Sequence, residues 1–251
     1  ERTLLPAIHE MVSVLKELEE KNQHVIKIGR THLQDATPVT FAQEVSGWRS
    51  SLEHNATMLA NSLTELRQLA IGGTAVGTGL NASKAYERAF IEALNEETGI
   101  QFSGETNKFH ALANRDAFVY VSGALKALAA NCMKMANDIR WLASGPRSGL
   151  GEITLPANEP GSSIMPGKVN PTQCEALAMV AVQVMWNDTA IGMAASQGNF
   201  ELNVYLPLIA FDLLQSIRLL TDALHSFSDK CLKGLVVNED QMADLLEQSL
   251  M

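Results

Sequence analysis

Two polar segments of the chain carry side chains that could hold a small anion and move protons on it. One segment spans residues 29–38 and the other spans residues 161–175. Arg30 and Lys168 could bind carboxylates, because guanidinium and ammonium groups form charge-assisted hydrogen bonds with them. The other candidate side chains are Thr31, His32, Ser162, Ser163, Asn170 and Glu175. Together they predict proton transfer on a small polyanion.

The predicted proton carrier is His32, supported by the carboxylate of Glu175. A carboxylate partner can keep the pKa of an imidazole near the working pH. Glu175 lies about one turn into a helix that begins near Pro171, and the free N–H groups of that helix end could bind an anion. Each residue also has a structural alternative: Asn170 is a good N-cap, Glu175 suits a first helical turn, and His32 could be a satisfied structural histidine.

Other kinds of site find little support in the motifs. Residues 77–82 fit the dinucleotide pattern G-x-G-x-x-A, but no βαβ unit surrounds them, so we interpret them as a helix–helix loop that needs positive φ angles. Residues 161–168 have five residues between their glycines, not the four of a phosphate loop. No G-x-S-x-G serine is present, and no two histidines have ligand spacing on one helix, so no metal site is expected.

The composition is that of a folded protein that does not bind nucleic acid. Of the 251 residues, 46% are hydrophobic, which is enough to offset the entropy of ordering the chain. The net charge of −9 argues against a nucleic-acid partner. The three cysteines are too far apart for a disulfide framework and indicate a reducing compartment. The apolar run 176–195 contains Gln183, Asn187 and Asp188, so we expect a buried helix and no membrane association.

Nearly the whole chain is expected to be helical. Apolar residues recur at steps near 3.5 residues over residues 38–69, with polar breaks at Asn55 and Ser62. Thr37 and Pro38 predict the start of this helix, as its N-cap and first position. Further helices are predicted over residues 4–22, 82–97, 107–143, 171–195, 204–226 and 239–250. No segment alternates long enough for a sheet, so the predicted class is all-α, a bundle of long helices.

The two polar segments resemble the fumarase/aspartase superfamily of lyases. Residues 161–171, Gly-Ser-Ser-Ile-Met-Pro-Gly-Lys-Val-Asn-Pro, are similar to its signature loop over their whole length. Residues 29–38, Gly-Arg-Thr-His-Leu-Gln-Asp-Ala-Thr-Pro, resemble its second shared region. Within the superfamily, His32 resembles the fumarases, since aspartases carry Gln there, and Gly167 stands where aspartases typically have Ala. The flanking residues 72–81, 114–116 and 199–203 also look like class II fumarases.

The resemblance implies the reversible hydration of fumarate to L-malate, a step of the tricarboxylic acid cycle, without a metal or an organic cofactor. Ser162 matches the family's catalytic serine, which removes the C3 proton of malate. His32, paired with Glu175, would relay the proton to the hydroxyl that leaves. The residues implied in substrate binding are Thr31, Ser163, Lys168, Val169 and Asn170.

The resemblance also implies a homotetramer, packed through a core of long helices, whose active site is built from three subunits. Residues 1–251 are expected to be the single central helical domain, with the family's N-terminal and C-terminal domains absent. Such a piece alone would bind dicarboxylates weakly and turn over little. A cytoplasmic location is expected, or the mitochondrial matrix in a eukaryote. The alternatives are another superfamily lyase, chiefly aspartase or argininosuccinate lyase, and a non-catalytic oligomerisation scaffold.

Overall fold

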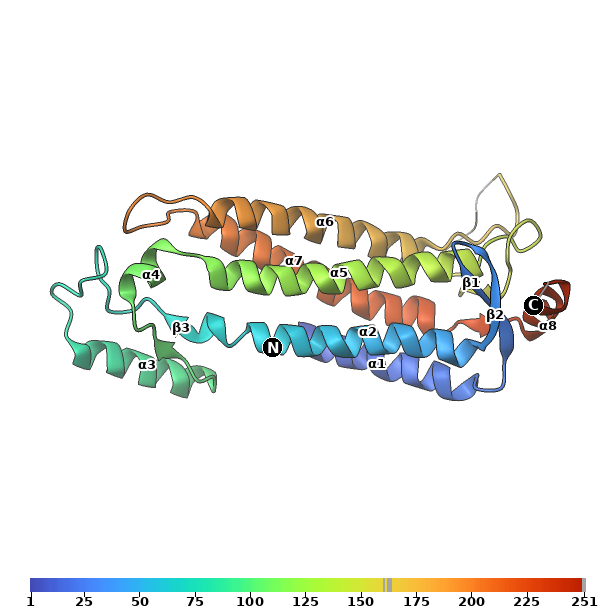
Figure 1. Ribbon diagram of the computed structural model, residues 1–251, viewed down its shortest axis with the longest axis horizontal. Helices are drawn as coiled ribbons and strands as arrows, with labels where there is room; N and C mark the ends of the chain where they lie inside the picture. The colour runs from blue at the N-terminus through green and yellow to red at the C-terminus, as the bar shows by residue number, and fades with distance from the viewer. Residues whose placement is uncertain (160, 162–163, 250–251) are drawn as a thin grey trace. The chain divides into compact units, whose positions relative to one another are not determined.

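The computed structural model describes residues 1–159, 161 and 164–249, and long helices dominate it (Figure 1). The helices are α1 (Leu4–Lys21), α2 (Phe41–Ser62), α3 (Lys84–Thr98), α4 (Lys108–Ala113), α5 (Asp116–Leu142), α6 (Thr172–Ala195), α7 (Leu206–Phe227) and α8 (Glu239–Gln248). The strands are β1 (Ile26–Thr31), β2 (Gln34–Thr40), β3 (Gln68–Leu69), β4 (Ser103–Gly104), β5 (Ile153–Thr154) and β6 (Val236–Val237). A 3₁₀ turn (Glu65–Arg67) follows α2, and a π-helical turn (Ser228–Leu232) follows α7. The predicted all-α class is confirmed.

The chain forms two compact units. Unit 1 consists of Glu1–Ala56, Ala127–Gln183 and Arg218–Met251, and unit 2 consists of Thr57–Lys126 and Val184–Ile217. The four helices α2, α5, α6 and α7 contribute residues to both. The assignment of all 251 residues to one central domain stays a prediction.

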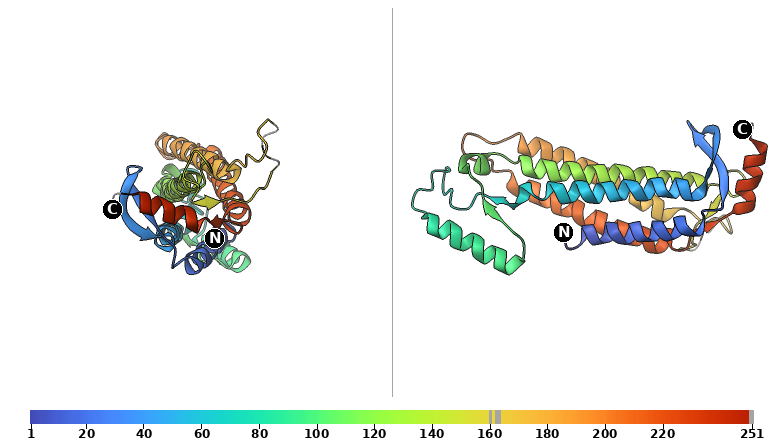
Figure 2. Two further views of the ribbon diagram at one scale, coloured as in Figure 1. Left: turned by 90° about the vertical axis from the view of Figure 1, so that its right-hand side faces the viewer. Right: turned by 60° about the horizontal axis from the view of Figure 1, so that its bottom comes forward.

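Unit 1 is a helical bundle with polar links between its helices. Parts of α1, α2, α5, α6 and α7 run side by side in it (Figures 1 and 2). Asn55 on α2 is buried, and its Oδ1 accepts a hydrogen bond of 2.8 Å from Asn131 Nδ2 on α5. The polar break predicted at Asn55 is therefore a satisfied contact between two helices, as the burial of an amide requires.

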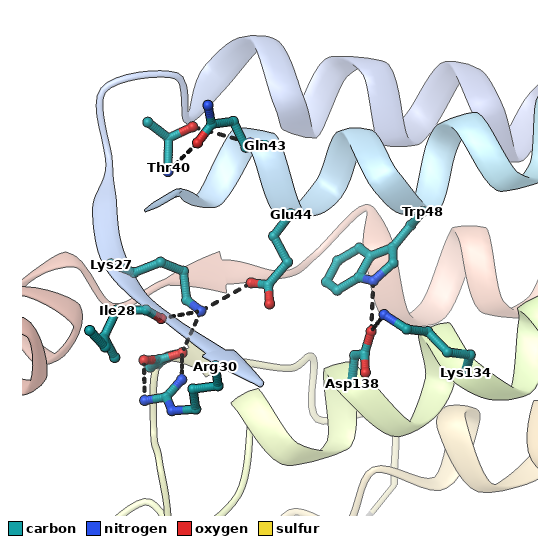
Figure 3. A network of polar contacts seen from close by, with 10 residues as sticks. Lys27, Ile28, Arg30, Thr40, Gln43, Glu44, Trp48, Lys134 and Asp138 are labelled. Carbon is teal, nitrogen blue, oxygen red and sulfur yellow. Dashed lines mark hydrogen bonds and ion pairs between the residues drawn. The ribbon is translucent and has the colours of Figure 1, made fainter. Parts of the chain in front are cut away.

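The start of α2 differs from the prediction. Thr37 and Pro38 do not cap a helix, because residues 34–40 form β2 and Pro38 lies opposite Ile28 of β1. A capping box starts the helix instead: Gln43 N–H donates to Thr40 Oγ1 at 3.1 Å, and Thr40 N–H donates to Gln43 Oε1 at 2.9 Å (Figure 3). The helix also ends at Ser62, short of the predicted residue 69.

The single helix predicted over residues 107–143 is divided in two in unit 2. The predicted start is nearly right: Asn107 is the N-cap of α4, and its Oδ1 accepts from the N–H groups of Phe109 and His110. The helix then breaks before Arg115, whose guanidinium donates to the carbonyl oxygens of Ala111, Asn114 and Asn203. The break frees carbonyl groups that a continuous helix would have used, and the buried guanidinium of Arg115 donates hydrogen bonds to those of Ala111 and Asn114.

The apolar run 176–195 falls within α6, as predicted, but the helix is not buried on all sides, because Met179, Trp186 and Met193 are exposed. In unit 2 the helix buries Asn187, whose Nδ2 donates to Ser216 Oγ and Gln215 Oε1 on α7, both at 3.0 Å. Across the described residues, the model contains no helix with the length and hydropathy needed to span a membrane.

The three cysteines of the chain are buried, free and all in unit 1. Burial raises the pKa of the Cys132 thiol to about 12. Cys174 and Cys231 lie with their Sγ atoms 3.9 Å apart, and the hydrogen bond between them, together with burial, raises the pKa of Cys231. Only the thiolate is nucleophilic, so these side chains should be unreactive while the fold is intact.

We therefore expect no fast alkylation of Cys132, Cys174 or Cys231 by iodoacetamide at pH 8 in the native protein. A thiol with a pKa of about 12 is ionised in only about one molecule in 10⁴ at that pH. In concentrated urea all three should react. Peptide mass mapping measures the modification at each position, and rapid labelling of any of them without denaturant would contradict the burial.

Candidate active site

The candidate histidine lies at the tip of the hairpin formed by β1 and β2 in unit 1. Thr31 pairs with Gln34, so only His32 and Leu33 remain in the turn. Both have positive φ, 55° and 59°. A turn with two left-handed residues matches the twist of a hairpin but favours Asn-Gly, because a β-carbon in this conformation costs roughly 1–2 kcal/mol per residue. His32 is exposed, so its imidazole is presented on a strained backbone.

The strands of this hairpin approach each other closely at a glycine. The pairing register shifts between Ile28 and Arg30, where Ala36 and Thr37 of β2 lie opposite the single residue Gly29 of β1, so β2 bulges opposite Gly29. A β-carbon on Gly29 would lie 2.5 Å from the carbonyl oxygen of Thr37, closer than any side chain allows. The glycine that opens the polar segment is thus required by the backbone.

Two cations at the base of the hairpin meet a buried carboxylate in unit 1. Arg30 Nη1 and Nη2 donate to Glu152 Oε2 and Oε1 at 3.1 and 2.8 Å. Lys27 Nζ lies 3.3 Å from Glu152 Oε2 and 3.2 Å from Glu44 Oε2, toward which it points in Figure 3. The side chains of Lys27 and Glu152 are 1% and 0% exposed, so each buried charge has an opposite partner. Arg30 is bound internally, which corrects its interpretation as a holder of substrate carboxylates.

The network continues from the hairpin to α2 and α5. Burial raises the pKa of Glu44 above its ordinary value, and the attraction of Lys27 opposes this shift. Further along, Trp48 Nε1 donates to Asp138 Oδ2 at 2.9 Å, and Lys134 pairs with the same carboxylate (Figure 3). The hairpin is thereby joined to the helices through polar contacts as well as apolar packing.

The second polar segment connects β5 to α6 in unit 1. Ser162 and Ser163, the predicted base and a predicted binding residue, lie outside the described residues. The ends of the loop meet: a β-carbon on Gly161 would lie 2.4 Å from the carbonyl oxygen of Lys168. The predicted binding residues at the end of the loop, which are Lys168, Val169 and Asn170, are all exposed. Their side chains are free of the core and can face a ligand.

Glu175 is in the first turn of α6, as predicted. Its N–H donates to the Pro171 carbonyl at 3.1 Å, and its carboxylate lies 3.7 Å from Arg140 Nη2 of α5. Among the residues that the structure describes, no hydrogen bond or ion pair joins His32 to Glu175. Lys168, Asn170 and Glu175 thus lie at or just before the start of α6, and His32 lies at the hairpin tip.

A pocket of about 430 Å³ lies in unit 2, at the loop with the G-x-G-x-x-A pattern. Gly77, Gly79 and Asn81 in this loop have positive φ, which confirms its interpretation as a helix–helix loop. Lys108 also lines the pocket, and its Nζ pairs with Glu87 Oε1 at 2.5 Å.

The residues that sequence reasoning missed are those that hold the hairpin: Lys27, Glu44 and Glu152. None belongs to a recognisable motif. The available signal was weak: Lys27 interrupts the apolar residues Val25, Ile26 and Ile28, which marks a buried or paired cation.

Comparisons with known proteins agree with the family resemblance seen in the two polar segments. Residues 1–186 match the protein-family model described as Lyase. The chain is 59% identical over 248 residues to a class II fumarate hydratase of Helicobacter pylori, and 59% identical over 251 residues to one of Bacillus anthracis. These alignments cover 99% and 100% of the chain but 54% of each relative. The chain thus spans about half the length of the curated relatives it matches.

Solved structures share the fold. A class II fumarase from Schistosoma mansoni superimposes with a TM-score of 0.98 at 44% identity, covering 100% of this chain and 55% of that one. A fumarate lyase:delta crystallin from Brucella melitensis gives a TM-score of 0.96 at 41% identity, covering 98% of this chain and 54% of its own.

Replacing Leu33 by glycine should stabilise the hairpin. The side chain is 60% exposed, so little packing is lost, while a left-handed backbone strain of about 1 kcal/mol is relieved. The midpoint of urea unfolding should rise. The matched control is Leu80→Gly, at a leucine that is 72% exposed and is not among the residues with positive φ, where no gain is expected. An equal or lower midpoint for Leu33→Gly would show that the turn is unstrained.

Proposed function

The chain belongs to the lyase family, and we propose that the protein is a class II fumarate hydratase, which adds water reversibly to fumarate to give L-malate. The observation that carries the proposal is the 59% identity to class II fumarate hydratases over essentially the whole chain. The hairpin with His32 and the start of α6 with Glu175 support it, because they present the predicted groups on exposed, well-defined elements.

In the proposed reaction, Ser162 removes the proton from C3 of malate. The electron pair then delocalises into the adjacent carboxylate, and the C2 hydroxyl leaves as water with a proton from His32. Glu175 supports the imidazole of His32 during this transfer. Stabilising the extra negative charge is the largest demand on the site.

We assign substrate binding to the exposed polar groups near the two segments. Lys168 would pair with one carboxylate of the dicarboxylate, and Asn170 and Thr31 would donate hydrogen bonds. Ser163 would bind through its hydroxyl and backbone, while Val169 would line the site. Their exposure and their position just before the start of α6 support this assignment for Lys168, Val169 and Asn170.

The proposed active protein is a homotetramer, in which His32 of one copy meets Glu175 of another. Within the described part of one chain no hydrogen bond or ion pair joins these two side chains, and the hairpin tip is exposed; both observations support this arrangement. Large apolar side chains that are exposed on α6 and α7 in unit 2 also support it, because a protein surface seldom leaves so many uncovered. They are Trp186, Met193, Leu208, Phe211 and Leu214. A cytoplasmic location is part of the same proposal.

Replacing Trp186 by glutamate should weaken self-association. Trp186 is 68% exposed on α6, and a carboxylate there would have to lose water on assembly. Analytical ultracentrifugation at micromolar concentration should show tetramer for the unmodified protein and smaller species for Trp186→Glu. Tyr86→Glu on α3, at an aromatic residue that is also exposed, should leave the tetramer intact. A monomeric unmodified protein would rule out the proposed assembly and the scaffold alternative together.

The loss of fumarate ultraviolet absorbance tests the reaction in the complete protein. Hydration of fumarate is expected, and Ser162→Ala should lower kcat by about 10²-fold or more, as expected when a catalytic base is removed. Ser13→Ala, at an exposed serine of α1, should leave kcat unchanged. A folded tetramer without activity would refute the proposal. Release of ammonia from aspartate, or of arginine from argininosuccinate, would then identify one of the alternative lyases.

A further inference from the structure

The exposed tip of the hairpin needs support that its own turn does not provide. His32 and Leu33 both adopt left-handed backbone conformations that favour other residues. The nearest side chain of β1 that reaches the interior is Arg30, two residues before His32. Its contacts therefore bear directly on where the tip is held.

Arg30 is bound by the carboxylate of Glu152, whose backbone is in turn hydrogen-bonded to other parts of unit 1. Both terminal nitrogens of Arg30 bond the two oxygens of Glu152, a geometry that sets direction as well as distance. The backbone of Glu152 is anchored on both sides: its N–H donates to the Leu142 carbonyl at 2.8 Å, and its carbonyl accepts from Asn238 N–H at 2.9 Å. The hairpin is thus bound to a residue whose backbone is held by the end of α5 and by Asn238, which precedes α8.

Glu152 also leads directly into the second polar segment. It precedes β5, which pairs with β6, and the chain after β5 forms the loop that ends at α6. One buried side chain therefore connects the element that carries His32 to the start of the segment that carries Lys168 and Asn170.

The charges of this cluster are balanced without help from a ligand. Lys27 and Arg30 supply two positive charges, and Glu44 and Glu152 supply two negative ones. A buried ion pair is a poor source of stability, because well-packed apolar residues often serve equally well. Its directional geometry is better suited to fixing a position.

We propose that Arg30 and Glu152 are positioning residues, which hold the backbone at Thr31 and His32 so that the imidazole meets the substrate at a fixed place. This inference rests on the proposed hydratase function. It assigns the two residues a role in the reaction without contact with the substrate.

The chain offers a matched control in the same unit. Arg49 bonds two carboxylates through Nε and Nη1, those of Glu19 at 2.7 Å and Glu53 at 2.8 Å. It lies on α2 and links that helix to α1, and among the described residues no hydrogen bond or ion pair joins its side chain to either polar segment. Arg30→Lys and Arg49→Lys each keep the positive charge and remove the two-pronged guanidinium. The two variants therefore differ mainly in the contact that is lost: hairpin to Glu152 in the first, and α2 to α1 in the second.

The experiment measures kcat and KM for fumarate and amide hydrogen exchange over residues 29–36 in the complete protein. For Arg30→Lys we expect kcat to fall by about 10–100-fold with KM within about threefold, because misplacement of a catalytic group affects the reacting complex more than binding. Exchange in the hairpin should be about tenfold faster or more. Arg49→Lys should leave all three quantities within about twofold.

The outcomes separate this inference from the proposed function. If the unmodified protein hydrates fumarate and Arg30→Lys changes neither kcat nor hairpin exchange, or changes them no more than Arg49→Lys, the positioning role is overturned. If the unmodified protein does not hydrate fumarate, the proposed function fails. Faster amide exchange confined to the hairpin in Arg30→Lys would then still show that Arg30 and Glu152 hold the hairpin in place. Should Arg30→Lys fold poorly, Glu152→Asp, which keeps the carboxylate and shortens its reach, is measured in the same way.

Discussion

A carboxylate removed from water must be surrounded by donors, and the side chain of Glu152 imposes this requirement on unit 1. Its partners Arg30 and Lys27 come from a hairpin more than a hundred residues earlier in the chain, and Lys27 in turn contacts Glu44 on the next helix. Since an unpaired charge in this place would be far more costly than any single apolar contact, the hairpin, α2 and β5 have to meet here. The candidate site is arranged around this meeting point.

The long helices could be predicted because their periodicity extends over many turns. α1, α6 and α7 have nearly the predicted bounds, and α4 begins within one residue of the predicted start at residue 107. The hairpin was not predicted, because its turn has His-Leu where Asn-Gly is usual, and because Pro38 in a strand resembles the start of a helix. A tertiary contact, the guanidinium of Arg115, decides the break between α4 and α5, and no local pattern announces it.

The candidate site was predictable in its residue types and only partly in its geometry. The sequence indicates which side chains are chemically capable, and the exposure of His32, Lys168 and Asn170 agrees with that interpretation. The proposed pairing of His32 with Glu175 would depend on which surfaces meet in an assembly, and the local sequence contains no such information. The charges behind the site were missed for another reason: a buried ion pair joins residues whose separation in the sequence has no regular spacing.

The discontinuity of the two units has a consequence for how the protein is made. Unit 1 draws on residues 1–56, 127–183 and 218–251, so its first helix is synthesised long before its last. At translation rates of about 5–20 residues per second, α1 and the hairpin wait roughly 10–30 s for the partners that cover them. During that time the apolar faces of the nascent chain are open to wrong contacts, and loop closure over such separations is slow. Unit 1 can therefore complete its core only after its last stretch, which begins at residue 218, has been synthesised.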